Sequence, residues 1–72
     1  MVVVEVYLHG KKVNEVVRVD TIVGPHYYSS WPTMVRYEWD FIEDLLKSYA
    51  RNGAKFVHLG KEIPLEKVLE VL

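Results

Sequence analysis

The stretch GPHYYSSWPTMVRYEWDFIEDLLKSYARNG, residues 24–53, decides the fold, because it holds the only long helical pattern in the chain. Its apolar residues recur in steps of four and three, at Val35, Trp39, Ile42, Leu46 and Tyr49. These steps keep one stripe on one side of an α-helix, and the opposite side is charged. The pattern predicts a helix over residues 35–51 with one face in the core and the other in water.

The flanks of this stretch carry signals for the two ends of the helix. Pro32 suits a first helical turn, where a missing N–H costs nothing, and Ser30 or Thr33 could cap that end. The pair Asn52-Gly53 suits a left-handed C-terminal cap. We therefore expect residues 25–33 to form a loop and the helix to stop at Asn52.

Upstream of this stretch, the chain reads as a β-hairpin. Residues 2–8 alternate and are dense in valine, the turn lies at His9-Gly10, and residues 13–23 return as a second strand. We assign one face of the second strand to the core, namely Val17, Val19, Thr21 and Val23. With this phase, Val13 needs a bulge near Asn14 and Glu15 to stay in register.

Downstream, residues 55–59 read as a short third strand with Val57 and Leu59 on the core face, opposite Phe56 and His58. Gly60 marks a turn, and residues 61–63 read as a brief fourth strand. Pro64 then opens a last short helix with a single apolar stripe, which consists of Leu65, Val68, Leu69 and Leu72.

These elements predict an α+β fold in one domain, residues 1–72. The order is ββαβ(β)α, with a three- or four-stranded, mainly antiparallel sheet packed on one main helix and a short C-terminal helix. One main helix covers only one face of such a sheet, so we expect a two-layer domain whose second sheet face is open.

The composition limits the class of protein. A chain of 72 residues buries a small share of its surface, and zero cysteines rule out disulfides as support, so we expect a homo-oligomer. The missing cysteines and the lack of a membrane span or signal peptide favour the cytoplasm. The absence of glutamine, with many Val, Glu, Lys and Tyr residues, is typical of thermophilic proteins.

The open sheet face is the expected oligomer surface. With the strand phases above, it would carry Tyr7, Ile22, Phe56 and His58, together with His9, Arg18 and Asp20. This mixture is more apolar than a plain solvent surface and more polar than a core.

The expected loop before the helix is the main candidate binding site. It contains His26, Tyr27, Tyr28 and Trp31, and aromatic side chains on a rigid loop offer large contact area at low entropy cost. They could contact a partner protein. In the alternative structural interpretation, Trp31 and one tyrosine close over the protein's own small core.

A second function is single-stranded nucleic-acid binding. Bases would stack on Tyr27, Tyr28 and Trp31, and cations near the loop would follow the phosphates, namely Arg36, Arg18, Lys11 and Lys12. The net charge of −1 weighs against this interpretation, because proteins that neutralise phosphates usually carry a basic excess.

A third function is a small enzyme whose site forms between subunits. Its acid or base would be His26, His58 or Glu38, but no catalytic motif accompanies them. Asp40 and Asp44 lie on the charged helix face, which is typical of solvated carboxylates. The sequence predicts no catalytic residue, metal site or cofactor.

The sequence therefore predicts a small, non-catalytic interaction or regulatory module that self-associates and contacts a protein partner through its aromatic loop. The binding residues of this hypothesis are His26, Tyr27, Tyr28, Trp31, Arg36 and Arg18.

Overall fold

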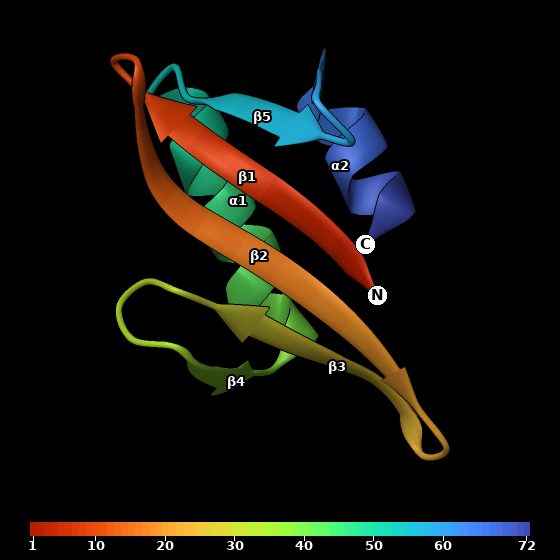
Figure 1. Ribbon diagram of the computed structural model, residues 1–72. Helices are drawn as coiled ribbons and strands as arrows, with labels where there is room; N and C mark the ends of the chain where they lie inside the picture. Colours follow the sequence, from red (N-terminus) through yellow and green to blue (C-terminus); the bar gives the residue numbers. More distant parts are fainter.

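In the computed structural model, which describes residues 1–72, two helices cover one face of a six-stranded antiparallel sheet (Figure 1). The elements are β1 (Val2–Leu8), β2 (Lys11–Thr21), β3 (Gly24–Ser29), β4 (Val35–Tyr37), α1 (Trp39–Arg51), β5 (Lys55–His58), β6 (Lys61–Ile63) and α2 (Leu65–Val71). The strands lie in the order β4-β3-β2-β1-β5-β6. The α+β class is confirmed, but the prediction of three or four strands is wrong because two strands lie in the expected loop and helix start.

Two tight turns with the same backbone join β1 to β2 and β5 to β6. His9 and Gly10 have φ angles of 53° and 78°, and Leu59 and Gly60 have φ angles of 52° and 75°. Positive φ at both central residues gives a turn whose twist matches the flanking strands. The hairpin at His9-Gly10 and the turn at Gly60 are confirmed.

The core lies between the sheet and the helices. The buried apolar side chains come from both layers and are Val4, Val6, Val16, Ile42, Leu46, Phe56, Val68 and Leu72. Ile42 and Leu46 belong to the stripe predicted for the main helix, and both are fully buried. The inward face of α1 is therefore as expected.

The predicted phase of the second strand is wrong. Val16 is fully buried, whereas Val17 and Val19, expected in the core, are half-buried on the opposite face of β2. Asn14 takes the neighbouring core position and is 2% exposed. A buried polar residue made the correct phase look unfavourable, because unpaired polar groups are costly in a core.

A bulge in β2 causes this change of phase. Val6 pairs with Asn14, and the next residue of β1, Tyr7, pairs with Lys12. Val13 is therefore the extra residue, one position before the bulge that we expected near Asn14 and Glu15. A bulge leaves its extra residue outside the ladder, and Val13 is exposed.

The phase predicted for the third strand is also wrong. Phe56 pairs with Val6 and is only 3% exposed, so it belongs to the core and not to an open oligomer surface. Leu59 lies in the turn after β5 and is 86% exposed. With Phe56 in the core, residues 57 and 59 have the opposite phase, so Leu59 would not face the core even if the strand continued past the turn.

The expected loop over residues 25–33 is instead largely strand. β3 pairs with β2 along its whole length, and β4 pairs with β3, so α1 begins at Trp39 rather than Val35. Glu38 occupies the N-cap position. Pro32, with its predicted capping neighbours Ser30 and Thr33, lies outside the helix.

The C-terminal end of α1 is as predicted. Asn52 is the C-cap and Gly53 has a φ angle of 81°. The N–H of Gly53 donates to the carbonyl of Ala50 at 3.1 Å, and that of Ala54 donates to the carbonyl of Tyr49 at 3.0 Å. These bonds satisfy carbonyls that the helix leaves without partners.

The last part of the chain also follows the prediction. The brief strand over residues 61–63 is β6, and Pro64 occupies the N-cap position of α2. Both helices are too short and too polar for a membrane-spanning segment.

Candidate functional site

The aromatic residues expected in one loop are divided between the two faces of β3. Tyr27 points toward the helices, where its ring lies 4.8 Å from that of Trp39 and its hydroxyl donates to the carbonyl of Leu72 at 3.0 Å. His26 and Tyr28 alternate with it and therefore lie on the open sheet face, both half-buried. Tyr27 thus closes this protein's own core, as the structural interpretation had it for one tyrosine.

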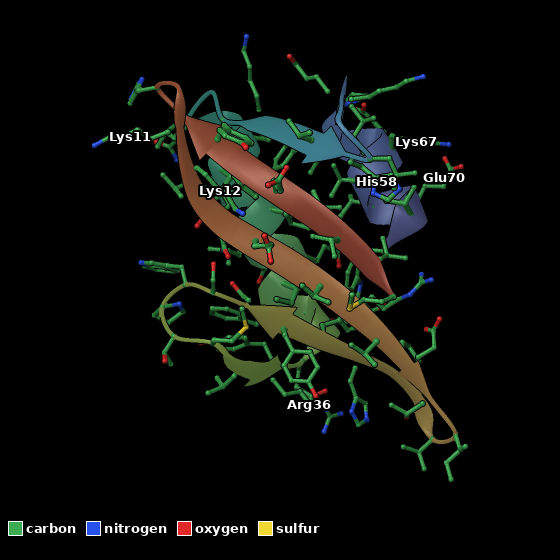
Figure 2. The ribbon with its side chains drawn as sticks, in the orientation of Figure 1. Lys11, Lys12, Arg36, His58, Lys67 and Glu70 are labelled. Atoms are coloured by element: carbon green, nitrogen blue, oxygen red, sulfur yellow. The ribbon has the colours of Figure 1, made fainter.

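The two arginines of the predicted site lie apart as well. Arg18 points toward the helices, and its Nη1 donates to the carbonyls of Val71 and Leu72, at 3.0 Å each. It thereby satisfies carbonyls at the end of α2. Arg36 is exposed at the β4 edge of the sheet, opposite Tyr28 on the neighbouring strand (Figure 2).

Trp31 is the member of the predicted set that offers a large accessible apolar surface. Its side chain is 52% exposed in the connection between β3 and β4. It lines a groove of about 480 Å³, together with Leu8, Val13, Leu45, Ser48, Tyr49 and Asn52. We call this hollow the Trp31 groove.

Each wall of the Trp31 groove comes from a different part of the fold. Leu8 ends β1, Val13 is the bulge residue of β2, and Leu45 lies on α1. Val13 is available because the bulge turns it out of the ladder. The groove is therefore a product of tertiary packing, and only Trp31 belonged to the predicted binding residues.

A buried polar network fixes the chain beside Trp31. The Asn14 Nδ2 donates to Ser29 Oγ at 2.8 Å and to the Tyr49 hydroxyl at 3.2 Å. The Asn14 Oδ1 accepts from the backbone N–H of Ser30 at 3.0 Å and from its hydroxyl at 2.8 Å. These bonds join β2, α1 and the segment that leads into Trp31.

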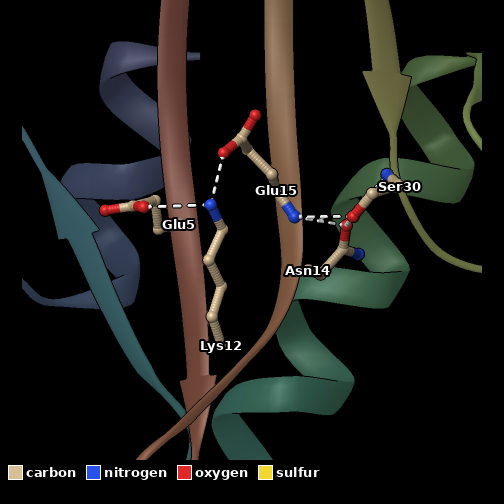
Figure 3. Close-up of polar contacts among 5 residues, drawn as sticks. All are labelled: Glu5, Lys12, Asn14, Glu15 and Ser30. Carbon is tan, nitrogen blue, oxygen red and sulfur yellow. Dashed lines mark hydrogen bonds and ion pairs between the residues drawn. The ribbon is translucent and has the colours of Figure 1, made fainter.

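The same network continues into the backbone. The N–H of Glu15 donates to Asn14 Oδ1 at 2.6 Å and to Ser30 Oγ at 2.9 Å (Figure 3). Ser29 Oγ accepts from the N–H of Trp31 at 3.3 Å and also donates to its carbonyl. Sequence reasoning missed this network, although a lone Asn within the valine-rich strand was a usable signal.

On the open sheet face, Lys12 bridges two carboxylates. Its ammonium lies 2.6 Å from Glu15 and 3.1 Å from Glu5 (Figure 3). The hydrogen bond to Glu15, followed by that to Glu5, raises the pKa of Lys12 above its ordinary value of 10.5. This part of the face is charged and solvated.

The four residues predicted as an oligomer surface do not share a face. Tyr7 lies on the open face, Phe56 is in the core, and Ile22 is at the tip of the turn between β2 and β3. His58 is half-buried, and its Nδ1 donates to the carbonyl of Val3 at 3.0 Å. The predicted surface therefore does not exist as one patch.

A second hollow, of about 510 Å³, lies at the β1–β5–β6 end of the open face. It is lined by Tyr7, His9, Gly10, Gly53, Lys55, Val57 and Glu62. The expected acid or base candidates His26, His58 and Glu38 line neither hollow. No group of three or more His, Asp or Glu side chains is placed to hold a metal ion.

Comparisons with protein-family models, curated proteins and solved structures gave no match to this chain.

Proposed function

We propose that this protein is a small, non-catalytic interaction module that associates with copies of itself and contacts a partner protein through the Trp31 groove. The single observation that carries the proposal is the half-exposed Trp31 on an apolar groove of about 480 Å³. The absence of cysteine supports a place in a reducing compartment, the cytoplasm.

The chemistry of the groove favours an apolar protein segment as its ligand. Leu8, Val13, Leu45 and the rings of Trp31 and Tyr49 offer aliphatic and aromatic surface. Tryptophan and tyrosine are typical of the residues that contribute most to protein–protein binding. A partner that inserts a few aliphatic or aromatic side chains would fit this surface.

The rigidity of the groove supports the same proposal. The bonds of Asn14 and Ser29 hold the residues next to Trp31 at fixed positions. A preorganised site loses less conformational entropy on binding than a mobile loop. Trp31 is therefore held in place to bind a segment at low entropic cost.

The arrangement gives less support to nucleic-acid binding. Stacking on successive bases needs aromatic rings along one track with cations beside it. Tyr27 is engaged with Trp39, Tyr28 lies on the open sheet face, and Arg18 is engaged with backbone carbonyls. The three predicted aromatic rings do not form one track.

Selection of ligands from a library of random linear peptides tests the proposal. Binding would be measured by Trp31 fluorescence in a Trp39→Phe background, where a phenylalanine keeps an aromatic ring against Tyr27. We expect apolar peptides whose binding shifts the emission to shorter wavelength, because the indole leaves water. Trp31→Ala, followed by calorimetry, should weaken binding ~30-fold or more, as at a central interface residue.

Met34→Ala is the matched control, because Met34 is 54% exposed in the same connection between β3 and β4 but does not line the groove. It should leave peptide affinity nearly unchanged. Selection of no peptide at all, or of peptides that bind the Trp31→Ala variant equally well, would exclude the groove as the partner site.

A further inference from the structure

The turn between β2 and β3 exposes two aliphatic side chains. Ile22 is 105% exposed and Val23 is 80% exposed. Turns of this kind are usually built from Gly, Asn, Asp, Ser or Pro, so two β-branched residues there need another explanation. We call residues 21–24 the hairpin tip.

The hairpin tip has a fixed shape. The hydroxyl of Thr21 donates to the carbonyl of Gly24 at 2.7 Å and accepts from the N–H of Val23 at 3.2 Å. Its backbone is thus held while Ile22 and Val23 project into water. A rigid apolar projection loses little entropy when another surface covers it.

The hairpin tip and the Trp31 groove lie at opposite ends of β2. Val13, a groove residue, is near the start of this strand, and the tip follows its last residue, Thr21 (Figure 1). The molecule is 37 Å long, and an eleven-residue strand itself spans ~36 Å. A tip therefore cannot reach the groove of its own chain.

Charges beside the two features are complementary. Asp20 precedes the tip; one of its carboxylate oxygens lies 3.2 Å from Arg18 Nε, and the side chain is still 64% exposed. Lys11, labelled in Figure 2, pairs across the hairpin with the groove residue Leu8. Arg51 precedes the groove residue Asn52 in the chain. Neither Lys11 nor Arg51 forms an ion pair within the chain, so both are available to a carboxylate.

We propose that the hairpin tip of one copy docks in the Trp31 groove of a second copy, with Ile22 and Val23 against the indole. This inference rests on the groove being a docking site, as proposed above, and names the occupant that the chain itself supplies. A two-fold axis makes the contact reciprocal, because each copy offers one tip and one groove. The assembly then closes as a dimer.

Sedimentation of the full chain and its variants tests the dimer. The wild type should form a dimer whose population rises with concentration. The double substitution Ile22→Ser/Val23→Ser and the single substitution Trp31→Ala should each weaken association ~30-fold or more. All of these side chains are exposed, so circular dichroism should show that the variants remain folded.

An equimolar mixture of the two variants is the decisive sample. The mixed pair keeps one of the two tip–groove contacts, whereas a dimer of either variant alone keeps none, so the mixture should contain more dimer than either variant alone. A wild type that stays monomeric, a dimer that tolerates the tip substitutions, or a mixture with no more dimer than either variant alone would each overturn the proposal.

Leu59→Ser is the matched control, because Leu59 is an aliphatic residue, 86% exposed, in the turn between β5 and β6. Its dimer should equal that of the wild type, and a dimer weakened as strongly as by the tip substitutions would contradict a specific contact. If the wild type sediments as a monomer but its groove binds selected peptides, the groove is a partner site and the second copy is excluded as its occupant. If the dimer depends on the tip but no peptide binds the groove, the second copy is its occupant and the partner segment is excluded.

Discussion

A single buried amide joins three segments at the Trp31 groove. Asn14 bonds to Ser29 in β3, to Tyr49 in α1 and to Ser30 before the indole, and it is 2% exposed. Because the low local dielectric strengthens such bonds and penalises their loss, a buried polar group of this kind fixes one arrangement of the backbone. The position of Trp31 thus depends on a residue that does not itself line the groove.

Asn14→Ala should lower the free energy of unfolding by ~1–3 kcal/mol, because it leaves buried donors and acceptors without partners. Chemical denaturation measures the loss. Asn52→Ala is the control, since Asn52 is exposed and its side chain donates only to the carbonyl of Ser48, at 2.7 Å. Equal losses for the two substitutions would show that the buried network does not hold the fold.

Lys12 stabilises the fold through a contribution that is lost at alkaline pH. Because its pKa is raised above 10.5 by Glu15 and Glu5, the folded chain holds the proton more tightly than the unfolded chain. The contribution is complete below the ordinary pKa and is lost as pH rises through the higher folded value. Above about pH 10.5, the wild type should therefore lose stability more steeply than Lys12→Met.

Denaturant unfolding at a series of alkaline pH values measures this difference. Lys11→Met is the control, because Lys11 is exposed and forms no ion pair. Its pH profile should match that of the wild type. Parallel profiles for the wild type and Lys12→Met would mean that the two glutamates do not retain the proton.

Among the elements, α1 was readable from the sequence because its apolar period is maintained over several turns. Its end was readable as well, since Gly53 supplies the positive φ of 81° that a left-handed cap needs. Its start was not, because Val35 continues the helical period by chance while its backbone pairs with Ser29 in β3. A strand of three residues is too short for its alternation to outweigh a helical period that continues through it.

β3 was hidden by its own composition. Pro25 ordinarily argues against an inner strand, but β4 pairs only with residues 27–29 of β3, so one side of Pro25 has no neighbouring strand. The alternation of Tyr27 and Tyr28 gave no sign of which face was buried, because both are tyrosines. The candidate site was therefore predictable only at Trp31, and its other walls required the register of β2 and the packing of α1.

The molecule as a whole has a small core and a large exposed apolar surface. Eight apolar side chains are buried in a chain of 72 residues, while Ile22, Val23 and Trp31 remain in water. Small domains without disulfides commonly gain stability by association. Met1 and Leu59 are also exposed, but Ile22, Val23 and the Trp31 groove place an apolar projection and an apolar hollow at the two ends of β2. This arrangement favours end contacts over face-to-face packing through the charged part of the open sheet face.

The two proposed occupants of the groove, a partner segment and the hairpin tip of a second copy, would exclude each other. A peptide selected for the groove should therefore dissociate the dimer, because it binds only the monomer. At a peptide concentration 100 times its dissociation constant, the share of chains with a free groove falls ~100-fold. The share of dimer falls more steeply, because each dimer needs two such chains. Sedimentation with labelled peptide measures both species, and a scrambled peptide is the control. A complex containing two chains and the peptide in each groove would show that the tip docks elsewhere.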